Sequence, residues 1–431
     1  MSANATTCSP PGNLTRNAAS HSPAQAASQQ SNTSVSFAAT LACIVLIAID
    51  LRPGIVSIGP LLPQLRAEFG LSNLQASLLT AIPTLFMGLL ALPSPWLVRR
   101  FGLNRVFLGA LSVLTIATAA RAFAPTWALL LLTTAGVGAG IAITGALIGG
   151  FVKTVSPNRM ALLMGVYAMS LGLGSTLAAG TTNPIAEIGG GWRVGSGIWA
   201  ILGVVSIIAW CIMARAQQTG PHLTKPHPQR TPLPVNHRKA WLLALYFASN
   251  NILFYGFLSW LVPLYRETGM NTSAAGILLA SFTTAFMLAN LVPGILSRKK
   301  DRRFMIAGSA AITFAGLAVV AQAPAFLPFI LVPVIAFGIG NSFTLGMTLP
   351  LDNTRTAHEA NAWNAFILGI GYGAGALGPL AMGALRDITG GFHAPMLFLV
   401  AFGLFKLALS PFLHPPASRD ITGTENSGQA T

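Results

Sequence analysis

Twelve apolar stretches, each of about twenty residues or more, follow one another along this chain with short polar breaks between them. A helix needs about 20 such residues to cross the roughly 30 Å hydrocarbon core of a bilayer. Only 8% of the residues are charged, against about 25% in soluble domains. The sequence therefore predicts an all-α, polytopic membrane protein surrounded by lipid. The predicted spans cover approximately residues 37–65, 74–98, 104–122, 126–151, 159–186, 194–214, 240–264, 273–297, 304–322, 326–350, 362–386 and 394–413.

Lysine and arginine are distributed unevenly between the polar breaks. Of the 25, eighteen fall in the termini and the breaks on one side, five in the opposite breaks, and two inside spans. Because cytoplasmic loops carry the excess of basic residues, we expect both termini to be cytoplasmic. The net charge of +15 then reflects topology, and no nucleic-acid partner is expected.

The second half of the chain repeats the first at an offset of about 200 residues. Residues 61–70 align with 261–269, with Leu61-Leu62-Pro63 on Leu261-Val262-Pro263. Such a colinear repeat is typical of transporters built from two parallel bundles. We therefore expect two pseudo-symmetric six-helix bundles with the substrate path between them. The predicted divisions are a disordered tail (1–34), the first bundle (35–214), a basic, proline-rich cytoplasmic linker (215–239), the second bundle (240–413) and a tail (414–431).

Asp50 and Arg52 are charged residues in the middle of the first span. A charge at that depth costs about 3 kcal/mol, so it usually has a function or a partner. The planar, five-donor guanidinium of Arg52 suits a small anion, or it is permanently paired with an acid. Asp50 either couples transport to protons or neutralises Arg52 or Lys406. Lys406, in the last span, is close enough to the helix end to reach the interface.

Polar side chains in the seventh span are the other candidates for substrate binding. Asn251 and Tyr255 stand four residues apart, on one face of a helix. Asn341, Tyr372 and Tyr167 are further candidates of the same kind. The alternative for all of them is hydrogen bonding between helices, worth about 0.6 kcal/mol each.

Leu51-Arg52-Pro53, followed by Ser57-Ile58-Gly59-Pro60-Leu61-Leu62-Pro63-Gln64-Leu65-Arg66, resembles the first-helix signature of one branch of the major facilitator superfamily. That branch holds the cyanate permeases and 2-nitroimidazole exporters. Leu349-Pro350-Leu351-Asp352 and Gly369-Ile370-Gly371-Tyr372 resemble it as well, and the likeness covers residues 37–413. The resemblance implies a twelve-helix carrier of the bacterial inner membrane that works by alternating access.

The breaks after the second and eighth spans resemble the gating loops of that superfamily. The superfamily carries an Asp where this chain has Arg99. The residues that the resemblance assigns to gating are Arg100, Gly102, Arg105, Asp301, Arg302 and Arg303.

No motif of an enzyme or an ATP-driven pump occurs in the chain: HExxH, GxSxG and the Walker loop are absent. Cys8, Cys43 and Cys211 lack the spacing of metal ligands, and we expect neither a metal nor a cofactor. The sequence predicts a monomeric secondary transporter of a small anion such as cyanate, with a proton as the candidate coupling ion. The alternatives are efflux of nitroimidazole-like or other drug-like compounds and a non-transporting membrane sensor.

Overall fold

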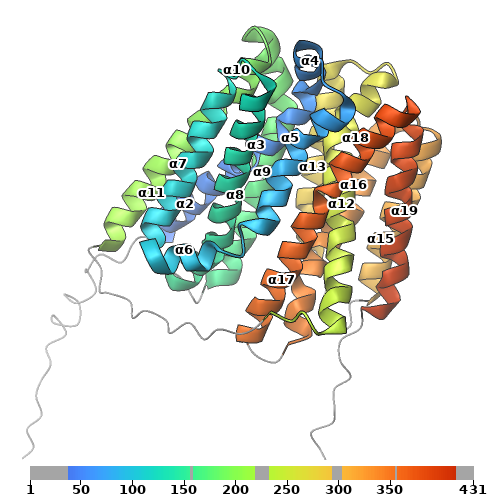
Figure 1. Ribbon diagram of the computed structural model, residues 1–431. Helices are drawn as coiled ribbons and strands as arrows, with labels where there is room; N and C mark the ends of the chain where they lie inside the picture. The colour runs from blue at the N-terminus through green and yellow to red at the C-terminus, as the bar shows by residue number, and fades with distance from the viewer. Residues whose placement is uncertain (1–36, 156–158, 219–232, 294–302, 355–356, 414–431) are drawn as a thin grey trace, which may run out of the picture.

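The computed structural model describes residues 37–155, 159–218, 233–293, 303–354 and 357–413, and every regular element in these ranges is helical (Figure 1). The N-terminal half contains α2 (Phe37–Asp50), α3 (Pro53–Val56), α4 (Ile58–Phe69), α5 (Asn73–Leu89), α6 (Ser94–Phe101), α7 (Leu103–Arg121), α8 (Trp127–Val155), α9 (Met160–Ile188), α10 (Trp192–Gly197) and α11 (Ala200–Gln218). The C-terminal half contains α12 (Arg238–Glu267), α13 (Thr272–Ala289), α15 (Arg303–Gln322), α16 (Pro328–Asp352), α17 (Ala357–Gly375), α18 (Leu377–Thr389), α19 (His393–Leu409) and η3 (Ser410–Phe412).

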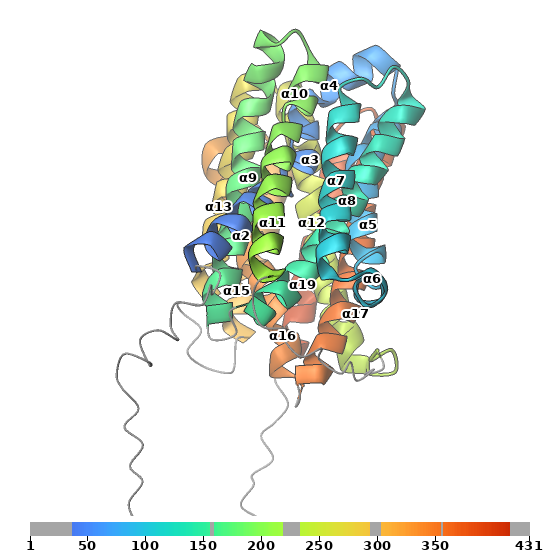
Figure 2. The same cartoon turned by 90° about the vertical axis from the view of Figure 1, so that its left-hand side faces the viewer.

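The helices form two bundles that stand side by side (Figure 1). Eleven helical segments of the described chain are long and apolar enough to span a membrane, and the 17-residue α5 makes the remaining crossing. The first crossing is built from α2, α3 and α4 in succession. Figure 2 shows α7 and α11 on the outer side of the N-terminal bundle. The predicted all-α fold of two six-helix bundles is confirmed.

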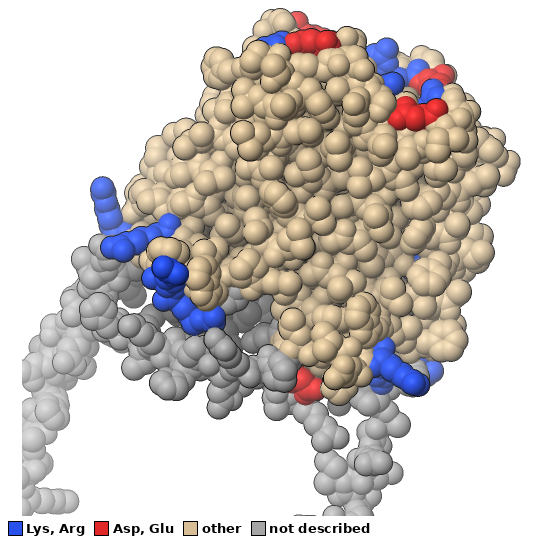
Figure 3. Space-filling model, viewed as in Figure 1, with Lys and Arg blue, Asp and Glu red and all other residues tan. Residues whose placement is uncertain are grey.

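Two ends of the molecule differ in charge. The linker end is the one at which α11 ends and α12 begins; the turn end is the opposite one, where α4 ends and α5 begins. Figure 3 shows mainly Lys and Arg at the linker end, charges of both signs at the turn end, and an uncharged belt between them. This belt is the surface expected for the part of a protein that lies in hydrocarbon.

An ion pair lies at the turn end in each half of the described chain. Glu68 accepts from Arg193 at 2.6 Å in the N-terminal half, and Glu267 accepts from Arg386 at 2.7 Å in the C-terminal half. Both acids lie near the end of the first crossing of their half. The arginines are not equivalent, because Arg193 begins the last crossing of its half, whereas Arg386 lies near the end of the crossing before the last.

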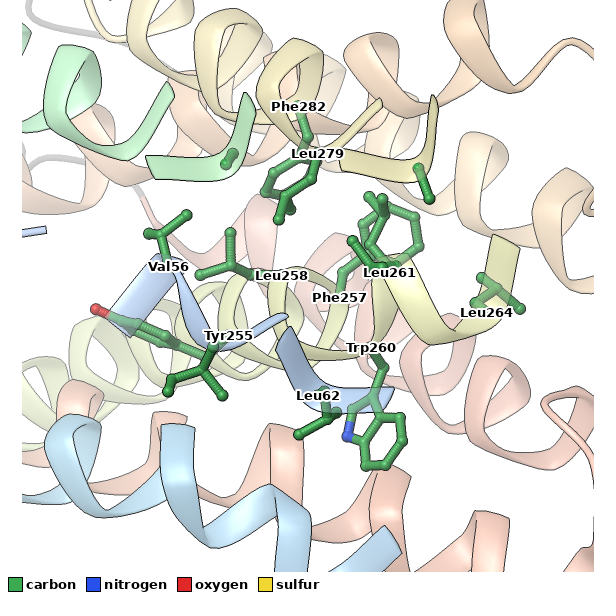
Figure 4. Packing of buried hydrophobic residues seen from close by; sticks show 14 of the residues in the cluster. Val56, Leu62, Tyr255, Phe257, Leu258, Trp260, Leu261, Leu264, Leu279 and Phe282 are labelled. Carbon is green, nitrogen blue, oxygen red and sulfur yellow. The ribbon is translucent and has the colours of Figure 1, made fainter. Parts of the chain in front are cut away.

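Three apolar cores divide the interior, and their membership shows where the halves join. One core takes buried residues from both halves, including Leu62 and Leu258 (Figure 4), and it reaches Trp192 and Tyr265 near the turn end. The second core draws only on the N-terminal half and the third only on the C-terminal half. The halves thus share apolar packing toward the turn end and keep separate cores toward the linker end.

A carboxylate also joins the halves at the turn end. Asp387 of α18 accepts hydrogen bonds from the backbone N–H groups of Asn73 (2.9 Å) and Leu74 (2.7 Å), and from the Asn73 amide (2.7 Å). These N–H groups begin α5, where helices lack internal acceptors and favour negative charge. Deeper along the same seam, the Ser77 hydroxyl donates to the Pro379 carbonyl at 2.8 Å. We call the Asp387 contact the turn-end cap.

Candidate functional site

The first crossing is interrupted at Arg52. Helix α2 ends at Asp50 and α3 begins at Pro53, whose ring removes the N–H that would continue the ladder. The Arg52 carbonyl accepts from the N–H groups of both Ile55 and Val56 at 3.1 Å. The sequence thus places a turn, and with it a charged side chain, in the middle of a membrane crossing.

Three tyrosines surround the guanidinium of Arg52. Tyr167 comes from α9, Tyr255 from α12 and Tyr372 from α17, so both halves contribute, and all three lie close enough to interact electrostatically with Arg52. The Tyr255 hydroxyl also donates to the Met87 sulfur at 3.7 Å. Figure 4 shows this hydroxyl directed away from the apolar side chains of the shared core. Arg52, Tyr167, Tyr255 and Tyr372 are the tyrosine–arginine site of this protein.

The site carries a positive charge and several phenol hydroxyls. Within the described ranges the Arg52 guanidinium forms no ion pair with a carboxylate. Arg52, Tyr167 and Tyr372 keep part of their surface exposed, while Tyr255 is buried. A guanidinium and phenol hydroxyls together offer donors in several directions to a small planar or linear anion.

Asp50 points to a different neighbour. It is buried and lies next to Ser206 of α11, whose hydroxyl donates to the Leu46 carbonyl at 3.2 Å, and its Oδ2 has no partner. It forms no ion pair with Arg52 or Lys406, so the interpretation of Asp50 as their neutralising partner does not match the structure. An acid that is buried beside a hydroxyl remains a candidate for proton coupling.

From its position near the helix end, Lys406 was expected to reach the membrane interface. The structure places it in the interior instead. It is fully buried, donates to Asn250 Oδ1 at 2.8 Å and stands 6.0 Å from the centre of the Tyr246 ring. Asn250 and Lys406 are each 200 residues beyond Asp50 and Ser206. The two bundles therefore hold equivalent buried polar pairs between their first and last crossings, with a different charge in each.

Arg121 is the buried residue that sequence analysis missed. It had been counted among the loop arginines because it ends an apolar span. Its side chain is fully buried, and it donates to the Gly54 carbonyl at 2.8 Å and to Thr134 Oγ1 at 3.3 Å. The only signal in the sequence was its place at the end of the third apolar run.

The two asparagines predicted for the substrate site are placed differently. Asn251 is buried one helical turn before Tyr255, and its amide donates to its own helix, at the Phe247 carbonyl (2.9 Å). Asn341 donates to Ser309 of α15 at 2.6 Å, inside the C-terminal bundle. The structure thus brings Arg52, Tyr255 and Tyr372 together and leaves Asn341 outside the tyrosine–arginine site.

The predicted gating residues lie at the linker end where they are described. Arg100 stands 5.5 Å from the Trp96 ring centre and 5.6 Å from that of Phe101. Gly102 joins α6 to α7 at φ +84°, a conformation that favours glycine, and Arg105 is exposed on the first turn of α7. Arg303 is exposed at the start of α15, whereas Asp301 and Arg302 lie outside the described residues.

Comparisons with known proteins match most of the chain to membrane transporters. A family model described as Major Facilitator Superfamily matches residues 37–379. The cyanate transport protein CynX of Escherichia coli (strain K12) is 31% identical over 381 residues, 87% of this chain and 98% of that protein. The 2-nitroimidazole transporter of the same organism is 29% identical over 373 residues, 84% of this chain and 92% of that protein.

A solved structure has the same fold. It is a bacterial homologue of the human lysosomal transporter Spinster in an inward-facing, unoccupied conformation, which superimposes with a TM-score of 0.69 at 20% identity. The match covers 86% of this chain and 96% of that one.

Proposed function

Because this chain belongs to the major facilitator superfamily, we propose that it is a secondary active transporter that carries a small anion such as cyanate by alternating access. The protein is a multi-pass membrane transporter, and its relatives are transporters rather than enzymes. What we propose beyond this is the cargo, the driving ion and the orientation in the membrane. We place it in the inner membrane as a monomer, with the linker end and both termini in the cytoplasm.

The observation that carries this proposal is an arginine with three tyrosine neighbours and, among the residues that the structure describes, no carboxylate partner. An uncompensated cation at mid-crossing is costly, and a bound anion would offset that cost. Arg52 and Tyr167 come from one half and Tyr255 and Tyr372 from the other. An anion bound there would contact both bundles, as a carrier that rocks one bundle against the other requires.

The distribution of the cores supports alternating access. The halves share a core toward the turn end and have separate cores toward the linker end. We infer that this arrangement is the state closed at the turn end. The excess of basic residues at the linker end supports a cytoplasmic position for that end.

Efflux of a planar aromatic compound is the second candidate. Its support is the 29% identity to the 2-nitroimidazole transporter and the aromatic surface that three tyrosine rings give the site. Tyrosine rings stack on planar ligands, and a nitro group carries partial negative charge that Arg52 would attract.

A thermal-shift screen of the purified protein separates the candidates. A ligand at 100 times its Kd stabilises the native state by about 2.7 kcal/mol, so the Tm should rise by several degrees. We expect cyanate, nitrate or bicarbonate to raise it and 2-nitroimidazole to leave it unchanged. A shift with 2-nitroimidazole alone would favour efflux. If every anion that raises the Tm enters proteoliposomes no faster than background, the protein is better described as a non-transporting sensor.

Asp50→Asn tests the proposed coupling of transport to protons. The amide keeps the size and polarity of the side chain but cannot exchange a proton. We expect proteoliposomes that carry this variant to equilibrate cyanate without concentrating it when a pH gradient is imposed. The measurement is the steady-state ratio of internal to external [14C]cyanate.

Ser206→Ala is the matched control for that experiment, because it removes the hydroxyl and leaves the carboxyl in place. It should retain accumulation driven by the pH gradient. If the Asp50→Asn protein concentrates cyanate as well as the parent does, Asp50 is not the coupling residue.

A further inference from the structure

Arg121 is a buried cation that the transport path does not explain. Its side chain is fully buried, and within the described ranges it has no carboxylate partner. Its two hydrogen bonds go to neutral groups, the Gly54 carbonyl and the Thr134 hydroxyl, and its Nε has none. Burying a charge against neutral partners is unfavourable compared with an apolar residue of the same size. A residue needed only for packing would not be an arginine.

The carbonyl that Arg121 holds belongs to the break in the first crossing. Gly54 lies two residues after Arg52, in the single turn that forms α3. Helix α8 presses on the same turn, since a Cβ added to Gly54 would lie 2.7 Å from Val137 Cγ1. The Thr134 hydroxyl, one turn earlier on α8, accepts the second hydrogen bond of the Arg121 guanidinium. Two neighbouring helices, α7 and α8, thus fix the turn from outside.

The direction of the Arg52 side chain depends on this turn. Arg52 precedes Pro53 and has backbone angles of φ −104° and ψ −37°, whereas a residue before proline prefers an extended conformation. The conformation therefore needs support from its surroundings, and the bond from Arg121 to Gly54 is a contact suited to give it. A changed turn would rotate Arg52 away from Tyr255.

We propose that Arg121 is a positioning residue: by holding the Gly54 carbonyl, it fixes the break in the first crossing and directs Arg52 toward the three tyrosines. This inference deepens the proposed function, on which it rests for its meaning in transport. Arg121 itself does not contact the cargo.

Cysteine labelling at position 52 tests the inference without any cargo. The three native cysteines are first replaced by alanine, and Arg52→Cys is introduced. The rate of reaction with the anionic reagent 2-sulfonatoethyl methanethiosulfonate then reports how position 52 faces the water-accessible path. We expect Arg121→Met, which fills the space but cannot donate, to lower this rate at least tenfold. Arg121→Lys, which can still donate to Gly54, should restore it to within about threefold of the parent.

Two controls separate a local rotation from a global change. Tyr372→Cys, introduced alone into the cysteine-free protein, reports the opposite side of the tyrosine–arginine site. The labelling rate at position 372 should not change when Arg121→Met is added. Thr134→Val leaves the guanidinium in place but removes one acceptor, and it should lower labelling at position 52 about threefold. If Arg121→Met does not yield a monodisperse protein, Thr134→Val and Arg121→Lys decide the question.

The inference is overturned if position 52 is labelled equally fast in the parent and in Arg121→Met. If Arg121→Met does not fold, equally fast labelling in the parent and in Thr134→Val overturns it. A parallel fall at position 372 also overturns it, because the effect would then be a general closing of the path. In the native background we expect Arg121→Met to raise the KM for [14C]cyanate about tenfold with Vmax within twofold. If Arg52→Gln leaves transport intact, the anion-carrier proposal fails while the labelling result stands.

Discussion

Replacing Arg52 with glutamine is expected to lower anion transport at least 100-fold. The glutamine amide has two donors against five for the guanidinium and carries no charge, and a charge-assisted hydrogen bond contributes about 1.5–3 kcal/mol. Losing a bidentate pair of such bonds corresponds to about two or more orders of magnitude, since about 1.4 kcal/mol is a factor of ten. The measurement is the initial rate of [14C]cyanate uptake into proteoliposomes, together with the thermal shift that cyanate induces. Both should disappear.

Arg52→Lys is the matched control, because it keeps the charge and loses the planar fork. We expect transport reduced about tenfold, between the parent and the glutamine variant. Uptake by Arg52→Gln within twofold of the parent would contradict the anion site. If overexpression confers resistance to a nitroimidazole and that resistance survives Arg52→Gln, the efflux hypothesis gains instead.

Replacing Gly88 with valine is expected to slow transport about tenfold or more while leaving anion binding in place. Helix α5 meets α17 of the other half here, and a Cβ on Gly88 would lie 2.7 Å from both the Gly369 carbonyl oxygen and the Gly373 nitrogen. Backbone atoms cannot move aside as a flexible side chain can, and overpacking costs about 1–3 kcal/mol. A wedge between the halves should therefore slow the exchange of states about tenfold or more.

Gly109→Val controls for adding a branched residue to a helix, because a Cβ at Gly109 meets nothing within 4 Å. This variant should transport at the parental rate. The Gly88→Val protein should still show the thermal shift with cyanate, which distinguishes it from Arg52→Gln. Parental uptake by Gly88→Val would mean that the halves do not need this close approach.

The sequence was sufficient to predict the crossings and the repeat, because the bilayer imposes the length and the apolarity of each span. It also predicted that Arg52, Tyr255 and Tyr372 belong together. Side-chain direction was harder, because these helices are apolar on most faces and their periodicity does not show which face meets which neighbour. Asn341 was therefore assigned to the site, although its amide bonds to Ser309. Arg121 was assigned to a loop for another reason, its place at the end of an apolar run.

The equivalent polar pairs show what the repeat alone could not reveal. The offset of 200 residues aligns Asp50 with Asn250 and Ser206 with Lys406, but only packing shows that the first and last crossings of each half meet at those positions. Sequence comparison of the halves finds similar residues, and here the equivalent residues differ in charge. A functional difference between two similar bundles is hidden from such a comparison.

The turn-end cap places unequal demands on the two surfaces that it joins. Asp387 contributes a carboxylate, whereas two of its three contacts on α5 are backbone N–H groups, at Asn73 and Leu74. Every residue except proline supplies such a group. The first turn of α5 can therefore exchange most of its side chains during evolution and stay attached, while α18 has to retain one acid. Substitutions are therefore tolerated in the first turn of α5 and destabilising at Asp387 of α18.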